Sequence, residues 1–267
     1  MAAFGGERML KIKNQAESAE IYIDGTIIDD EDSSWVRYFN DDTTGYQFPK
    51  EIKEQLDTIK DKPLTIYINS YGGSVAAGCA ISNMIAMHRA EVTAIVTGYC
   101  CSIATQIFFS ADICKMPSNT YLMLHKPTTI ESGNADDFRK TAEILDTIQR
   151  GLEATYLKKI RDEKAEPVLQ VDISKMRSEE TWLTGSEAAE NFQIELLEPV
   201  KTLNCVGSLN KLKALNYRKI PETLKFKDDG NKNPPSVLSE QQRQQKLYED
   251  RKKQIEIALA KSLAITI

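Results

Sequence analysis

Short runs rich in β-branched and aromatic residues alternate along the chain with segments whose apolar residues recur at helical spacing. Residues 49–60 show that spacing, because Ile52, Leu56 and Ile59 share one face among Lys and Glu. The β-type runs lie at residues 20–24, 64–69, 93–97 and 121–125. Strands that alternate with helices predict βαβ units and an α/β fold.

Two further helices are expected in this pattern. Tyr71-Gly72-Gly73 breaks the second strand, and a helix of small residues follows from about Val75 to Met87. A long helix is expected over residues 134–162, with Asn134 as its cap. Its spacing predicts one buried face, formed by Phe138, Ala142, Leu145, Ile148, Leu152 and Tyr156.

The composition changes near residue 222. The stretch "TLKFKDDGNKNPPS" is polar and contains Pro234-Pro235, which is typical of a linker. From Ser239 the chain is highly charged with a sparse apolar stripe, and Ser239-x-x-Gln242 resembles a capping box. A helix of this kind usually needs a partner surface, so we expect an assembly or scaffold-type extension.

Composition and charge exclude several classes of protein. The 267 residues carry a formal charge of -5 and a pI near 5.3, which does not favour nucleic-acid binding. No stretch approaches the roughly 18 apolar residues of a membrane span, and the N-terminus has no leader pattern, so an intracellular location is expected. The 5 cysteines match neither a disulfide framework nor a zinc site, and we interpret them as reduced.

The stretch "GYCCSIATQ" at residues 98–106 raises the possibility of a serine nucleophile. Ser102 would need a histidine to take its proton, and the sequence has only 2. His125 is the better candidate because it ends an apolar β-run just before a proline. His88 is explained by its place after a helix. Cys100 or Cys101 could replace the serine, but small buried thiols more often fill space.

An oxyanion would also need backbone donors. Gly72-Gly73 before a helix offers unobstructed amides, and the amide after the serine, that of Ile103, offers another. Taken singly, each feature has an ordinary structural explanation in packing, surface exposure or turn geometry. The sequence contains no G-x-S-x-G, H-E-x-x-H, phosphate-binding loop or dinucleotide fingerprint.

Taken in order, "YINSYGGSVAAGCAI", "GYCCSIA", "NTYLMLHKP" and "EETWLTGSEAAE" resemble the proteolytic subunit of the Clp protease. The resemblance covers roughly residues 18–200 and is greater to phage-encoded head maturation (prohead) proteases. It implies a crotonase-like α/β fold of stacked βαβ units and a Ser-His-acid peptidase. Ser102 would be the nucleophile, His125 the general base, and the amides of Gly73 and Ile103 the oxyanion hole.

The third triad member departs from the family, which has aspartate at the position of Glu180. Glutamate can still orient an imidazole, although its extra methylene changes the reach. Glu179 and Asp172 are the alternatives, and both glutamates could instead belong to a solvated turn. Tyr71 also replaces the usual proline, and Ile-Ala-Thr replaces Met-Gly-Ala after the serine.

The resemblance further implies partners and an organisation. The helix at 134–162 matches the handle that joins rings, and the loop "TTIESGNA", with Gly133, would hold an extended polypeptide substrate. A ring-shaped homo-oligomer without metal or cofactor is expected in a bacterial host cytoplasm, cutting phage scaffold or capsid precursors. An ATP-driven unfoldase is left open.

The predicted organisation has four parts: an N-terminal segment at 1–17, the peptidase domain at 18–201, a linker region at 202–238 and a C-terminal helix at 239–267. Two rival functions stay open. One is an acyl-CoA enzyme of the crotonase class, which needs no serine-histidine pair. The other is an assembly protein without catalysis, in which the C-terminal extension does the work.

Overall fold

The computed structural model describes residues 13–14, 17–32, 36, 45–160 and 173–199. All of them lie in the first of two compact units, Met1–Lys225. The linker region 202–238, the C-terminal helix 239–267 and most of the segment 1–17 fall outside the described residues. The boundaries predicted there therefore stay predictions.

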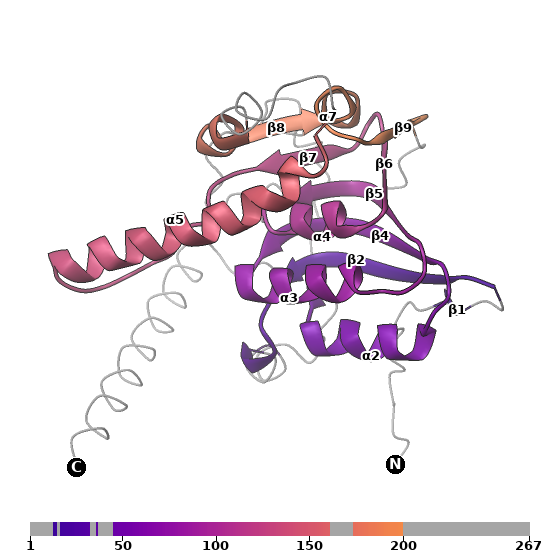
Figure 1. Ribbon diagram of the computed structural model, residues 1–267, viewed down its shortest axis with the longest axis horizontal. Coiled ribbons are helices and arrows are strands. Elements are labelled where there is room, and N and C mark those ends of the chain that lie inside the picture. Colours follow the sequence, from indigo (N-terminus) through magenta and orange to yellow (C-terminus); the bar gives the residue numbers. More distant parts are fainter. Residues whose placement is uncertain (1–12, 15–16, 33–35, 37–44, 161–172, 200–267) are drawn as a thin grey trace, which may run out of the picture. The chain divides into compact units, whose positions relative to one another are not determined.

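One mixed sheet forms the centre of the described part of the chain (Figure 1). Its path is β1-β2-β4-β5-β6-β9, and β2, β4, β5, β6 and β9 run parallel to one another. The strands are β1 (Lys13–Asn14), β2 (Ala19–Ile27), β3 (Tyr46–Gln47), β4 (Leu64–Gly73), β5 (Val92–Cys101), β6 (Ile113–Pro117), β7 (Tyr121–Leu124), β8 (Thr181–Thr184) and β9 (Glu195–Leu197). The predicted strands at 20–24, 64–69 and 93–97 are present within β2, β4 and β5, and the strand predicted at 121–125 is β7, which ends one residue earlier, at Leu124.

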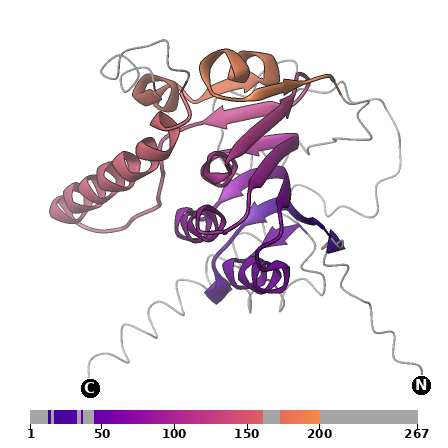
Figure 2. The same ribbon diagram turned by 45° about the vertical axis from the view of Figure 1, so that its right-hand side comes forward.

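Helices α2, α3 and α4 cover one face of this sheet (Figure 2). The described helices are η1 (Asp30–Asp32), α2 (Pro49–Ile59), α3 (Val75–Ala86), α4 (Ala104–Ser110), α5 (Ala135–Leu157) and α7 (Gly185–Asn191), and residues 173–178 are also helical. Alternate residues of the central strands are buried against the helices, among them Ile66, Ile68, Ala94 and Val96. This is the α/β architecture that the alternating pattern predicts.

The predicted break of the second strand at Tyr71 is wrong. Strand β4 continues to Gly73, because its pairing with β2 resumes after a shift of register that pairs Gly25 with Ser70 and Thr26 with Gly72. Tyr71 is the extra residue of this β-bulge. The glycines that suggested a break instead let the strand bend and continue.

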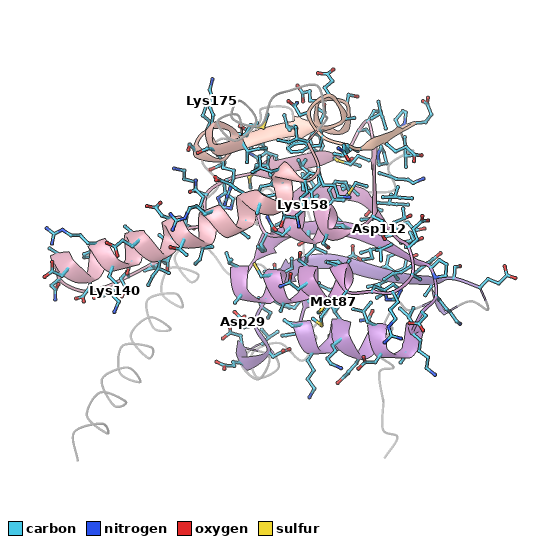
Figure 3. All side chains as sticks on the ribbon, viewed as in Figure 1. Asp29, Met87, Asp112, Lys140, Lys158 and Lys175 are labelled. Atoms are coloured by element: carbon cyan, nitrogen blue, oxygen red, sulfur yellow. The ribbon has the colours of Figure 1, made fainter. Side chains whose placement is uncertain are left out.

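The handle helix α5 is only partly buried. Asn134 caps it as predicted, and Asp137 completes a capping box that the sequence analysis did not identify. The helix ends at Leu157, and its predicted buried face is wrong at Phe138 and Ala142, which are exposed. Leu152 and Tyr156 are buried, since only the last turns pack on the sheet domain. Lys140 lies on the half that extends away from the sheet, whereas Lys158 lies beside it (Figure 3).

None of the described helices combines the length and the apolar character needed to cross a bilayer.

Candidate active site

Three strand ends meet at one edge of the sheet and place the predicted catalytic residues side by side. Strand β5 pairs with β7 so that Cys101 lies opposite Met123. Strand β8 pairs antiparallel with β7 so that Leu124 lies opposite Thr181. Ser102 directly follows β5, His125 directly follows β7, and Glu180 directly precedes β8. The three residues therefore lie at the same end of these paired strands.

Ser102 lies on a sharp turn between strand β5 and helix α4. Its φ of 57° is in the left-handed region, which is uncommon for a residue with a side chain and often occurs at functional turns. The Ser102 amide donates to the Met123 carbonyl at 2.9 Å, which fixes the backbone of the turn against β7. A serine on a turn between a strand and a helix resembles the nucleophile elbow of other hydrolases, although the G-x-S-x-G sequence is missing.

Gly72 on the neighbouring strand makes room for this elbow. A Cβ at Gly72 would lie 2.6 Å from the Ser102 Cβ and 2.7 Å from the Cys101 carbonyl oxygen. In the usual elbow, glycines flank the serine in sequence. Here the space comes from β4 instead, which sequence reasoning did not identify, because it assigned Gly72 only to a turn and an amide.

His125 contacts the candidate nucleophile directly. Its Nε2 lies 2.6 Å from the Ser102 Oγ, which is within hydrogen-bond distance. Burial lowers the pKa of His125 from its ordinary value of 6.5; Glu180 opposes this shift and Arg177 adds to it. The lowered pKa favours the neutral imidazole, which accepts the serine proton at Nε2 in the tautomer that carries its own proton on Nδ1.

Glu180 is the acid that the structure brings to this pair. It directly precedes Thr181, which pairs with Leu124, so the strand register places Glu180 beside the segment that carries His125. Its charge raises the pKa of His125 and adds to the burial that raises the pKa of Cys101. Glu180 is half-buried with a φ of 53°, whereas the neighbouring Glu179 is exposed. Asp172 lies outside the described residues. The triad role of Glu180 stays a prediction.

Of the two predicted oxyanion donors, Ile103 directly follows Ser102, whereas Gly73 lies against the Ile27 backbone. Gly73 has a φ of 147° and follows the glycine that contacts Ser102. Ile103 caps α4, where the Ser102 and Ile103 carbonyls accept from the amides of Thr105 and Gln106. An amide at such a position has no partner within its own helix. The oxyanion roles of both amides stay predictions.

The alternative nucleophiles are in unfavourable surroundings. Cys100 and Cys101 are fully buried, and burial raises the pKa of both thiols, which keeps them protonated at neutral pH. His88, the other histidine, contacts the Lys62 carbonyl at 2.8 Å instead. Within the described residues, no group of three or more His, Cys, Asp or Glu side chains is arranged to hold a metal ion.

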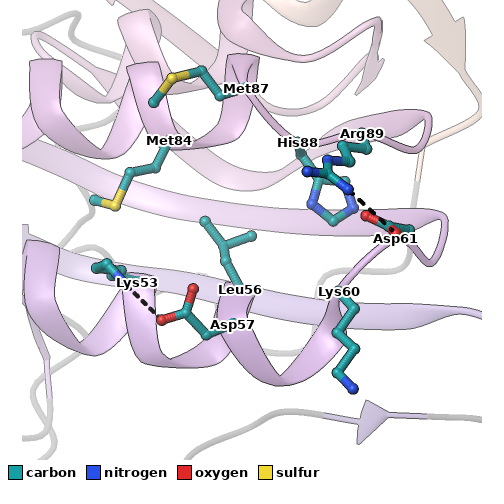
Figure 4. Close-up of a pocket in the computed structure, with 9 residues that line it drawn as sticks. All are labelled: Lys53, Leu56, Asp57, Lys60, Asp61, Met84, Met87, His88 and Arg89. Atoms are coloured by element: carbon teal, nitrogen blue, oxygen red, sulfur yellow. Dashed lines mark hydrogen bonds and ion pairs between the residues drawn. The ribbon is translucent and has the colours of Figure 1, made fainter.

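A surface groove of about 500 Å³ lies between α2 and α3, and Ser102, His125 and Glu180 are not among its lining residues (Figure 4). Its charges are largely paired, Lys53 with Asp57 and Arg89 with Asp61. The nine residues that line it are Lys53, Leu56, Asp57, Lys60, Asp61, Met84, Met87, His88 and Arg89.

Comparison with known proteins identifies the family. A family model described as Clp protease matches residues 46–192, more than half of the chain. The chain belongs to the Clp protease family. This Clp-family chain is 29% identical over 133 residues to the ATP-dependent Clp protease proteolytic subunit 2 of Thermobifida fusca, covering 49% of this chain and 63% of that protein. It therefore spans a little under two thirds of that relative.

A second curated relative and one solved structure agree with this assignment. The ATP-dependent Clp protease proteolytic subunit 3 of Rhizobium etli is 31% identical over 140 residues, which cover 51% of this chain and 68% of that protein. A ClpP1 point mutant from Listeria monocytogenes superposes with a TM-score of 0.52 at 22% identity, covering 67% of this chain and 91% of that one. The predicted ClpP-like α/β fold is confirmed.

Proposed function

We propose that this Clp-family chain is a serine endopeptidase that uses Ser102, His125 and Glu180. The observation that supports this most strongly is the distance of 2.6 Å between Ser102 Oγ and His125 Nε2. The two residues are 23 positions apart in sequence, and only the register of β5 and β7 brings them together. Ser102 also adopts a strained backbone conformation, and such strain occurs mainly at functional sites.

The mechanism follows from these positions. His125 Nε2 takes the hydroxyl proton as Ser102 Oγ attacks the peptide carbonyl carbon, and the carbonyl oxygen becomes an oxyanion facing the amides of Gly73 and Ile103. His125 then gives the proton to the leaving amine as the C–N bond breaks. Water, deprotonated by His125, attacks the acyl carbonyl carbon, and His125 returns the proton to Ser102 Oγ as the ester bond breaks. Glu180 stabilises the imidazolium that forms in each half. The reaction needs no metal or organic cofactor.

The acyl-CoA rival is less well supported by the same geometry. An enzyme that only stabilises a thioester enolate needs backbone donors but gains nothing from a serine held against a neutral histidine. A non-catalytic assembly protein likewise has no use for a glycine whose absent side chain makes room for Ser102. Both rivals predict that the Ser102 hydroxyl is dispensable.

The proposed peptidase acts as a ring-shaped homo-oligomer on polypeptides. Support comes from the projecting half of α5, where Phe138 and Ile144 are each 51% exposed and offer an apolar surface to other subunits. The resemblance of the sequence motifs to head maturation proteases supports phage scaffold or capsid precursors as substrates, in a bacterial cytoplasm. An ATP-driven unfoldase is not required by this proposal.

Cleavage assays on matched serine variants test the proposed activity. Ser102→Ala should abolish peptide cleavage, whereas Ser110→Ala, at the far end of the helix α4 that follows Ser102, should retain it. Unchanged cleavage in Ser102→Ala, or acyl-CoA turnover that survives it, would overturn the proposal. Incubating the assembled protein with a scaffold-capsid precursor and with an unrelated unfolded protein tests the substrate assignment, for which preferential cleavage of the precursor is expected.

A further inference from the structure

A buried arginine connects the elements that carry the proposed base and acid. Arg177 is 1% exposed and is the largest of the fully buried side chains in the described part of the chain. It lies in the helical stretch at residues 173–178, just before Glu180. Burying a guanidinium costs free energy unless its N–H groups donate hydrogen bonds, so the contacts of Arg177 indicate its role.

The guanidinium spans two separate segments. Its Nε donates to the His125 carbonyl at 3.2 Å, directly at the end of strand β7. Its Nη1 donates to the Gln149 carbonyl of α5 at 2.9 Å and lies 3.5 Å from the Glu153 carboxylate. Its Cζ stacks 5.5 Å from the centre of the Tyr156 ring. The strand end that carries the base is therefore fastened to the handle helix.

The backbone of the same residue contacts the acid. The Glu180 amide donates to the Arg177 carbonyl at 3.4 Å, which closes the turn in which Glu180 adopts its positive φ. One residue thus contacts the segment of the base through its side chain and the segment of the acid through its main chain. A displacement of Arg177 would change the distance between His125 and Glu180.

A second set of contacts joins α5 to the nucleophile. The Thr105 hydroxyl donates to the Ser102 carbonyl at 2.6 Å and accepts from the Tyr156 hydroxyl at 2.7 Å. Tyr156 is the residue on which the Arg177 guanidinium stacks. The last turns of α5 are therefore connected to both members of the Ser102–His125 pair.

We propose that Arg177 is a positioning residue that holds His125 and Glu180 in register with Ser102; this rests on the proposed peptidase function. A buried ion pair can often be replaced by apolar residues at little cost in stability, so charge neutralisation of Glu153 alone does not explain an arginine here. Lysine would neutralise Glu153 equally well. It lacks the planar fork that reaches the His125 and Gln149 carbonyls together.

The variant Arg177→Lys tests positioning separately from charge. We expect kcat for peptide cleavage to fall roughly 10- to 100-fold, as for a small misplacement of a catalytic group, with KM within about twofold. Arg150→Lys, on an exposed position of α5, is the matched control and should keep the kcat of the wild type. A kcat of Arg177→Lys within twofold of the wild type would overturn the proposal.

The double variant Arg177→Met with Glu153→Leu distinguishes a loss of positioning from a folding defect, because removing both buried charges together leaves neither one unpaired. It should keep a cooperative melting transition but lose kcat as Arg177→Lys does. A double variant with the kcat of the wild type would show that the pair has no positioning role.

Imidazole NMR makes this test independent of activity. The chain has only 2 histidines, and His88 contacts Lys62 instead of the site, so it serves as an internal reference. In Arg177→Lys the His125 ring resonances should shift while those of His88 stay in place. If the wild type cleaves no peptide, the proposed peptidase function fails, and the His125 resonances still decide the role of Arg177. Unchanged His125 resonances would overturn that role.

Discussion

Gly72 and Ser102 lie so close that a side chain at Gly72 would overlap the side chain of Ser102. A Cβ at Gly72 would fall 2.6 Å from the Ser102 Cβ, and Gly72 has a φ of 91°. The turn that presents the serine therefore depends on a glycine of the adjacent strand, 30 positions earlier in the chain.

Replacing Gly72 should reduce catalytic activity more than it reduces the stability of the fold. Gly72→Ala should lose about 1–3 kcal/mol of unfolding free energy from its positive φ, and should lower kcat/KM at least 100-fold because Ser102 must move. Thermal melting and peptide cleavage measure the two effects. The control is Gly151→Ala in α5, where a Cβ meets nothing within 4 Å; it should stabilise the helix by up to about 1 kcal/mol. Full cleavage by Gly72→Ala would contradict the described packing.

The pH dependence should report the buried imidazole. Because burial lowers the pKa of His125 below 6.5, kcat/KM should stay constant near neutral pH and fall only as the pH drops through that lower value. A pH profile of peptide cleavage measures this. An acid limb centred above 6.5 would show that His125 is not the base or that its surroundings are different.

Glu180→Gln should change both the rate and the pH profile. The carboxylate raises the pKa of His125, so its removal should lower that pKa and move the acid limb to lower pH. Loss of the orienting carboxylate should also reduce kcat by about two to four orders of magnitude. Glu179→Gln, at the adjacent exposed position, is the matched control. If Glu179→Gln lost activity and Glu180→Gln kept it, the third role would belong to Glu179.

The projecting half of the handle should matter for assembly and not for folding of the subunit. Changing Phe138 and Ile144 to serine removes apolar side chains that are each 51% exposed. The free energy of unfolding of the isolated subunit should therefore change by no more than about 0.5 kcal/mol. Sedimentation should then show smaller species than the wild type. Rings of wild-type size in this double variant would remove the handle from the proposed interface.

Local signals in the sequence were sufficient for much of the fold. The alternating runs predicted β2, β4, β5 and β7, and Asn134 with its acidic first turn predicted the start of α5. Ser102 and His125 could be paired from the chemistry of a serine nucleophile and the scarcity of histidine. For the strands and for the start of α5, the evidence lies within a few residues of the feature.

The features that were missed depend on contacts between distant segments. The bulge at Tyr71 follows from pairing with β2, and the space that Gly72 provides follows from pairing with β5. The spacing in α5 shows an apolar face but does not show whether the same chain covers it, so Phe138 was wrongly expected to be buried. Arg177 has the sequence signature of any surface arginine, and only its burial reveals its contacts.

Labelling with a fluorophosphonate probe, followed by peptide mapping of the assembled protein, tests the central claim most directly. The account predicts a single adduct on Ser102 that forms in the wild type and is absent from Ser102→Ala. An adduct on another residue, or none on the assembled wild type, would contradict it.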